Sequence, residues 1–143
     1  MSFRSNPFVA VLDANVLYPY RVRDVLLTFC QEGLFRARFT DQILEEWTRS
    51  VIRTKPKFEV SVRQQEAIIR KVFDDSLVKG HEPFIAALDL PDPSDRHVLA
   101  AAIRSNAQVI VTENLKDFTA DKLNEYEIEA LTGRFPCEYL HAV

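Results

Sequence analysis

The sequence predicts an α/β fold, a parallel sheet of four or five strands flanked by helices. The apolar runs Phe8–Leu12 and Val109–Val111 have strand length and do not alternate with polar residues, which is typical of parallel strands covered on both faces. Segments with helical periodicity separate these runs. Alternation of strands and helices favours a parallel sheet over an antiparallel one. At 143 residues the chain is predicted to form a single domain spanning residues 1–143.

The first half of the chain has clear start and stop signals. A helix is predicted over Val22–Glu32, closed by Gly33, and a short strand follows at Arg36–Phe39. Thr40 is a good N-cap for a helix over Asp41–Arg53, whose first acid suits the positive end of the helix. The next expected features are a break at Pro56, a helix capped by Ser61 and ending near Asp75, and a turn of helix within Phe84–Leu88.

The second half begins with the strongest helix signal. Asp92 is a capping acid followed by proline at the first helical position, and the helix is predicted to end near Ser105. Val109–Val111 is the second buried strand. Thr119 is expected to open a further helix, and Ile128–Ala130 to form a last short strand.

Composition excludes several classes of protein. Apolar residues make up 47% and charged residues 27% of the chain, which is ordinary for a globular domain and argues against disorder. No apolar run approaches the roughly 20 residues of a membrane helix, and the N-terminus lacks a signal-peptide pattern, so we expect a cytoplasmic protein with no membrane association. Cys30 and Cys137 show no zinc spacing, and buried thiols are expected. The net charge of −3 counts mildly against a nucleic-acid partner bound by bulk charge alone.

Acidic side chains follow both predicted buried strands. Asp13 comes directly after Phe8–Leu12, and Asp117 follows Val109–Val111 in a polar segment that also contains Thr112 and Asn114. Ligands of open parallel sheets bind beyond the carboxyl ends of the strands, so this placement makes these residues site candidates. Turn chemistry explains each segment equally well when it is considered singly, because Asp and Asn are common where a chain leaves a strand.

Two further acids are expected at the same edge. Asp95 shares a helix face with Val98 and Leu99, at the rim of the buried side, although a capping box with Asp92 is an alternative role. Glu46 lies nearer than Glu45 to the apolar stripe of its helix, so Glu46 is predicted to point inward. The histidines are predicted not to be ligands, with His97 pointing away from the Asp95 face; they are His81, His97 and His141.

Four segments taken together resemble the PIN-domain nucleases, in particular the VapC-like toxin ribonucleases of bacterial type II toxin–antitoxin pairs. The segments, in the order of the family, are Val11–Leu17 (VLDANVL), Ile43–Glu46 (ILEE), Pro91–Ala102 (PDPSDRHVLAAA) and Val109–Phe118 (VIVTENLKDF). The resemblance implies a PIN-like fold and a metal-binding catalytic set of Asp13, Glu46, Asp95 and Asp117. It assigns supporting roles to Asn15, Thr112 and Asn114. Asn114 stands where the family often has a further aspartate, which puts a second metal in doubt.

The resemblance also implies a chemistry. Clustered carboxylates repel one another, and oxygen-only ligation favours Mg²⁺ or Mn²⁺ over zinc. A divalent cation at such a site activates water for in-line attack on an RNA phosphodiester, leaving 5′-phosphate and 3′-hydroxyl ends. An RNA substrate, a cognate antitoxin that blocks the acidic groove, and a homodimer are the implied partners. Candidate phosphate contacts are Arg21, Arg23, Arg49, Arg53, Lys55 and Lys57.

Other functions stay open at this point. A nuclease acting on DNA ends or flaps is one, and a catalytically weak or inactive PIN-fold module that binds RNA or regulates another protein is a second. Asn114 keeps the second alternative open, and the four retained acids weigh against it. A third is an unrelated phosphate-binding α/β domain, in which Glu46 and Asp95 would have no role.

Overall fold

The computed structural model describes residues 8–135 and shows a four-stranded, entirely parallel sheet. The strands are β1 (Val9–Leu12), β2 (Arg36–Arg38), β3 (Val109–Val111) and β4 (Glu129–Leu131), in the spatial order β2-β1-β3-β4. The two central strands are the two apolar runs of the sequence. The predicted α/β class with a parallel sheet is confirmed.

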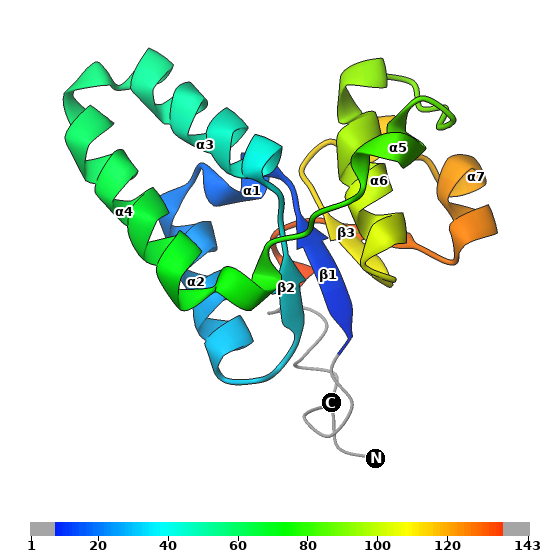
Figure 1. The fold of residues 1–143 in the computed structure, drawn as a ribbon, viewed down its shortest axis with the longest axis horizontal. Helices are drawn as coiled ribbons and strands as arrows, with labels where there is room; N and C mark the ends of the chain where they lie inside the picture. The colour runs from blue at the N-terminus through cyan, green and yellow to red at the C-terminus, as the bar shows by residue number, and fades with distance from the viewer. Residues whose placement is uncertain (1–7, 136–143) are drawn as a thin grey trace.

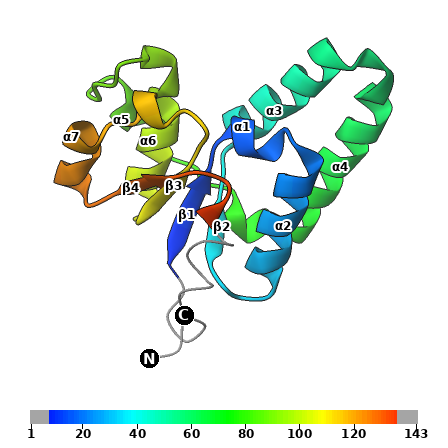
Figure 2. The ribbon, with the colours of Figure 1, turned by 180° about the vertical axis from the view of Figure 1, so that it is seen from behind.

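Helices cover both sides of the sheet. They are α1 (Ala14–Leu17), α2 (Tyr20–Gln31), α3 (Asp41–Thr54), α4 (Glu59–Val72), α5 (Glu82–Ile85), α6 (Arg96–Arg104) and α7 (Ala120–Leu123). In both views α1–α4 lie to one side and α5–α7 to the other (Figures 1 and 2). Within residues 8–135, none of these helices has the length and apolarity that crossing a membrane requires.

The core explains the apolar runs. Ala10, Val11 and Leu12 of β1 are fully buried, as is Ile110 of β3, because helices pack on both faces of the central strands. Helix α6 is buried over the whole stretch from His97 to Ala102 and contacts both β1 and β3. A helix buried on all sides has no solvent face to which a polar side chain can turn.

Several predicted boundaries are wrong by a turn or less, and each has a local reason. Helix α2 begins at Tyr20, before Val22, because Pro19 precedes its first turn as N-cap residue. Helix α4 begins at Glu59 after a 3₁₀ turn at Pro56–Phe58, so Ser61 lies inside the helix, where its hydroxyl accepts a hydrogen bond from Gln65. Gly33 ends α2 with a φ of 79°, the left-handed conformation predicted for it.

The later elements show smaller differences. The helical turn expected within Phe84–Leu88 is α5, which begins and ends earlier. Asp92 caps as predicted, by accepting from the backbone N–H of Ser94, but the first turn, Pro93–Asp95, is a 3₁₀ helix that leads into α6. The last strand, β4, is shifted by one residue from Ile128–Ala130.

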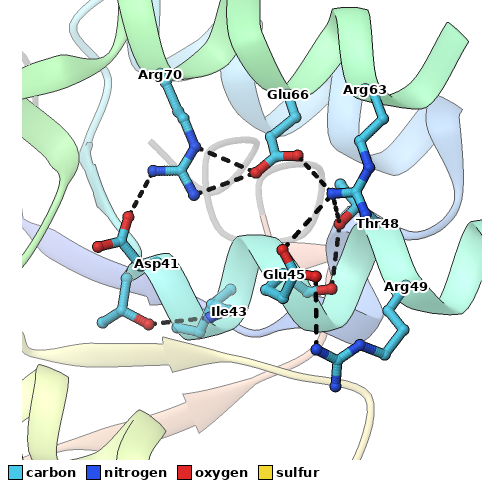
Figure 3. Close-up of polar contacts among 9 residues, drawn as sticks. Asp41, Ile43, Glu45, Thr48, Arg49, Arg63, Glu66 and Arg70 are labelled. Carbon is cyan, nitrogen blue, oxygen red and sulfur yellow. Dashed lines mark hydrogen bonds and ion pairs between the residues drawn. The ribbon is translucent and has the colours of Figure 1, made fainter. Parts of the chain in front are cut away.

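Helices α3 and α4 form a hairpin closed by ion pairs. Glu66 of α4 is buried and accepts from Arg63 and Arg70, which also reach Glu45 and Asp41 of α3 (Figure 3). Arg63 also donates to the buried hydroxyl of Thr48. Glu66 therefore holds Arg63 and Arg70 against one side of α3. These contacts fix the orientation of α3, and with it the side chains on the opposite side of the helix.

Candidate active site

The sheet register places Asp13 next to Thr112. Leu12 of β1 pairs with Val111 of β3, and Asp13 and Thr112 are the residues that follow them. The backbone N–H of Asp13 donates to Val111, and the Thr112 hydroxyl donates to Asp13 Oδ2 at 2.9 Å. Asp13 is 5% exposed and Thr112 is fully buried. The candidate site therefore begins on the carboxyl edge of the two central strands.

Polar neighbours fix the Asp13 carboxylate in one orientation. Its Oδ1 accepts from the backbone N–H of Ala14 at 2.7 Å, and its Oδ2 lies 3.4 Å from the side-chain amide of Asn15. The Thr112 hydroxyl accepts from Asn15 at 3.2 Å and from the backbone of Asn114 at 3.0 Å while it donates to Asp13. That hydroxyl has used its one proton and both lone pairs, so its role is to orient Asp13.

A groove of about 740 Å³ opens in front of Asp13. It combines carboxylates from three elements with two arginines. The residues that line it are Asp13, Ala14, Asn15, Tyr18, Glu46, Arg49, Ser50, Arg53, Thr54, Asp92, Ser94, Asp95 and Asn114. We call it the acid groove. The predicted acids Asp13, Glu46 and Asp95 thus share one cavity.

Asp117, the fourth predicted acid, does not line the acid groove but lies close to two acids that do. Oxygen atoms of Asp92, Asp95 and Asp117 lie within 4.8 Å of one another, a spacing that suits a metal ion. Asp92 was predicted only as a capping residue, and it does cap Ser94. Its proximity to Asp117 was not predicted, because a cap signal already explained its position and only the fold brings the two acids together.

Two carboxyl groups of the acid groove, those of Asp13 and Asp95, have raised pKa values, so their ionised forms are disfavoured. Burial raises the pKa of Asp13, against the opposing effect of the hydrogen bonds from Thr112 and Ala14. Burial first, and then the charges of Asp13, Asp92 and Asp117, raise the pKa of Asp95 to about 6. Asp92 is exposed, and its hydrogen bonds with Ser94 hold its pKa below the usual range.

Glu46 and Glu45 separate as the helical periodicity predicts. Glu46 lines the acid groove, whereas Glu45 turns toward α4, where Arg63 approaches it at 3.6 Å. Arg49, one turn further along α3, approaches Glu45 at 3.5 Å (Figure 3). His97 is the correction. It is 4% exposed, and its Nε2 lies 3.1 Å from Glu46 Oε2. The expectation that His97 points off the Asp95 face left it without a role at the site, but its imidazole contacts Glu46 of α3, which lines the acid groove.

The candidate phosphate contacts fall into three groups. Arg49 and Arg53 line the acid groove on the same face of α3 as Glu46. Arg21 and Lys55 line a neighbouring pocket, and the Lys55 ammonium lies 5.7 Å from the Tyr18 ring centroid. Lys57 lies over the exposed ring of Phe58.

Arg23 is the second correction. It is 9% exposed, and its guanidinium donates to the Leu17 carbonyl at 2.6 Å and to Gln65 at 2.6 Å. The same group lies 4.9 Å from the Trp47 ring centroid. These contacts tie α1, α3 and α4 together, so Arg23 is a structural residue and not a phosphate contact.

The role of Arg23 predicts a loss of stability rather than of RNA affinity. Arg23→Ala removes buried hydrogen bonds and leaves the Leu17 carbonyl without its donor, at a cost of about 2–3 kcal/mol in the free energy of unfolding. Arg21→Ala, at an exposed position of the same helix turn, is the control and should change it by less than about 0.5 kcal/mol. Urea unfolding followed by circular dichroism measures both, and equal midpoints for the two variants would contradict the assignment.

Two other predictions concern single residues. Cys30 is a free, partly buried thiol, and Cys137 and His141 lie outside the described residues 8–135. Trp47 and Phe39 are fully buried, whereas Phe58 is 44% exposed and is not part of the core.

Comparison with known proteins agrees with this geometry. The family model of the PIN domain matches residues 9–116, from β1 to the segment that follows β3. The protein named "Putative ribonuclease VapC50" of Mycobacterium tuberculosis (strain ATCC 25618 / H37Rv) is 54% identical over 52 residues. That stretch is 36% of this chain and 30% of the relative, so the match spans less than a third of the relative's length. No solved structure gives a significant match. The family match covers most of the chain, including both central strands and Asp13, and ends one residue before Asp117; the chain therefore belongs to the PIN domain family.

Proposed function

We propose that this protein is a metal-dependent endoribonuclease, and that it acts as the toxin of a toxin–antitoxin pair. The observation that carries the proposal is the acid groove, where Asp13, Glu46, Asp92 and Asp95 meet beside Arg49 and Arg53. Carboxylates and guanidinium groups that line the same groove suit a phosphodiester held close to a cation. Membership of the PIN family and the similarity to a relative named as a ribonuclease support the activity.

The residues of the acid groove fit a divalent cation. Among the described residues, Asp95 Oδ2 is buried without a hydrogen-bond partner, and a carboxylate oxygen of Asp95 lies within 4.8 Å of oxygens of Asp92 and Asp117. A buried, unpartnered carboxylate oxygen among other acids is costly unless a positive charge meets it. The oxygen-only donor set suits Mg²⁺ or Mn²⁺, held by Asp13, Glu46, Asp95 and Asp117 with Asp92 close by. When bound, such a cation supplies an activated water molecule for hydrolysis of the phosphodiester.

The chain's own side chains prepare the rest of the reaction. Asp13 is held by Thr112 and Ala14, so its carboxylate needs no rearrangement when a cation binds. Arg49 and Arg53 present guanidinium groups that bind phosphates on either side of the bond to be cut. Because the cation would activate water, hydrolysis needs neither a nucleophilic side chain nor the 2′-hydroxyl of the substrate, and the expected products carry 5′-phosphate and 3′-hydroxyl ends.

Cleavage of a pool of structured RNAs tests the proposed function. The purified chain should cut RNA in Mg²⁺ or Mn²⁺, lose the activity in EDTA and regain it when the cation is restored. Single-stranded and duplex DNA of matched length separate this function from a nuclease of DNA ends or flaps. A folded, cation-loaded chain that binds RNA without cutting it would favour the alternative of an RNA-binding or regulatory module, and would point to Asn114 as the residue that weakened the site.

Arg49 and Arg53 make a separate prediction about RNA affinity. Replacing both with alanine should lower the slope of log K against log salt by about 1–2, because two phosphate contacts are lost. Arg36→Ala is the control, since this exposed arginine begins β2 at the opposite edge of the sheet. Fluorescence anisotropy of a labelled single-stranded RNA in EDTA measures binding without cleavage. An unchanged salt slope in the double variant would remove both arginines from the RNA contact.

We propose an antitoxin as protein partner and a homodimer as the assembly. A second pocket, of about 620 Å³, adjoins the acid groove and shares Tyr18 with it. It exposes Tyr20 and Phe58, which are 65% and 44% exposed, and its described lining includes Arg21, Arg23 and Lys55 but no acid. A partner segment with apolar and acidic side chains suits this pocket and would extend over the acid groove.

A further inference from the structure

His97 is the buried side chain that meets Glu46. It occupies the second position of α6, two residues after Asp95, whereas Glu46 lies in the middle of α3. The distance from His97 Nε2 to Glu46 Oε2 is 3.1 Å. One short segment, Asp95–His97, thus supplies two groups to the site. Asp95 contributes a carboxylate to the acid groove, and His97 contacts the carboxylate of Glu46.

Glu46 needs such a contact because its side chain is partly exposed to solvent. The side chain is 38% exposed, and a glutamate has several rotamers that lead into water. Gln42, one turn earlier on the same helix, approaches the same oxygen at 3.3 Å, but Gln42 is itself exposed. His97 is the anchor, because a side chain that is 4% exposed in a packed helix cannot follow Glu46 away from the groove.

The contact requires a hydrogen on Nε2. Two acceptors do not approach to 3.1 Å, so Nε2 is assigned the hydrogen that faces Glu46 in this ion-pair contact. Nδ1 is buried and has no hydrogen-bond partner among the described residues, so Nε2 is the nitrogen through which His97 acts. This arrangement, an imidazole N–H that fixes a carboxylate beside a cation site, is the kind of outer contact that tunes metal affinity.

We propose that His97 is a positioning residue that holds the Glu46 carboxylate toward the cation of the acid groove. The proposal rests on the proposed function, because it gives Glu46 a cation to face. His97 touches neither the cation nor the RNA in this account. It acts through Glu46, by restricting the carboxylate to the orientation in which it faces Asp13 and Asp95.

Two substitutions at position 97 separate positioning from packing. His97→Met keeps a long, buried side chain and removes the donor. His97→Gln restores an N–H at the place of Nε2. His81 is the control, since it is also buried, at 5% exposed, and its Nδ1 also makes no hydrogen bond among the described residues, lying 3.4 Å from Glu82, but it lies outside the acid groove. His81→Met therefore reproduces the cost of burying methionine in place of histidine.

The readout is the affinity for Mn²⁺, titrated by calorimetry, with unfolding followed by the fluorescence of Trp47, the single tryptophan. We expect His97→Met to weaken Mn²⁺ binding about 10- to 100-fold. His97→Gln should recover most of that affinity, and His81→Met should bind Mn²⁺ as the wild type does. In the metal-free wild type, ¹⁵N spectra of the imidazole should show His97 protonated on Nε2, and Glu46→Ala should shift that signal.

The outcomes separate this proposal from the proposed function. Wild-type Mn²⁺ affinity in folded His97→Met, or equal losses in the methionine and glutamine variants, would overturn the positioning role while leaving the nuclease intact. If His97→Met weakens Mn²⁺ binding but the wild type cuts no RNA, the positioning role stands and the nuclease does not. A wild type that binds no Mn²⁺ would contradict both.

Discussion

Asp13→Asn is expected to abolish RNA cleavage, lowering kcat/KM by at least about 10³-fold, while the chain stays folded. Asp13 lies at the centre of the acid groove, and asparagine replaces one carboxylate oxygen with an amide that carries no charge. The amide nitrogen would also face either the Ala14 N–H or the Thr112 hydroxyl, both of which donate to Asp13. The variant therefore loses both the charge and the orientation of the ligand.

The fold should tolerate this substitution because the Asp13 charge does not stabilise it. Burial raises the pKa of Asp13, which means that the ionised carboxylate is disfavoured in the folded chain. Asp75→Asn, at an exposed position outside the acid groove, is the control and should cleave RNA normally. Single-turnover cleavage gives the rates, and circular dichroism checks the fold. Cleavage by Asp13→Asn at the wild-type rate would remove Asp13 from the mechanism.

The second large effect concerns Asp95 and the pH dependence of stability. The pKa of Asp95 is raised from 3.8 to about 6 in the folded chain, so the folded state keeps this proton to higher pH than the unfolded state does. Between about pH 4 and pH 6 the folded chain therefore binds more protons, and the free energy of unfolding falls as the pH rises. After a discount for partial exposure, the loss attributable to Asp95 is about 1–2 kcal/mol.

A divalent cation should reverse this loss. Mn²⁺ neutralises the repulsion among the acids, so at pH 7 it should raise the midpoint of thermal unfolding of the wild type. Asp95→Asn should stabilise the metal-free chain at pH 7, flatten its pH dependence between pH 4 and 6, and respond less to Mn²⁺. Thermal unfolding at several pH values, in EDTA and in Mn²⁺, measures all of these. The raised pKa of Asp95 would be contradicted if the metal-free wild type became more stable from pH 4 to pH 6 and Asp95→Asn did not show this gain.

The parts of the fold that local patterns determine were predictable. The runs around β1 and β3 are apolar because both faces are covered, and Thr40 caps α3 by accepting from Ile43, as its position before Asp41 indicates. Asp13 and Thr112 could each be placed at the end of a strand. That these ends are neighbours was an assumption of parallel pairing, and the register of Leu12 with Val111 confirms it.

The parts that depend on tertiary packing were not predictable. His97 has a polar side chain on a helix whose neighbours were unknown, and only the contact between α6 and α3 shows that its direction leads to Glu46. Arg23 has the sequence context of an exposed cation, but it turns inward to the Leu17 carbonyl and Trp47. Asp92 was correctly predicted as a capping residue. Because capping already explained its position, nothing in the sequence indicated that it would lie close to Asp95 and Asp117.

The most direct test of the account is the identity of the RNA ends made by the wild-type chain in Mn²⁺. Hydrolysis supported by a cation in the acid groove predicts products with 5′-phosphate and 3′-hydroxyl ends, and EDTA should stop their formation. Cleavage should also persist when the 2′-hydroxyl at the mapped site is replaced by hydrogen. Cleavage that continues in EDTA, leaves a 2′,3′-cyclic phosphate and stops on the 2′-deoxy substrate would contradict it.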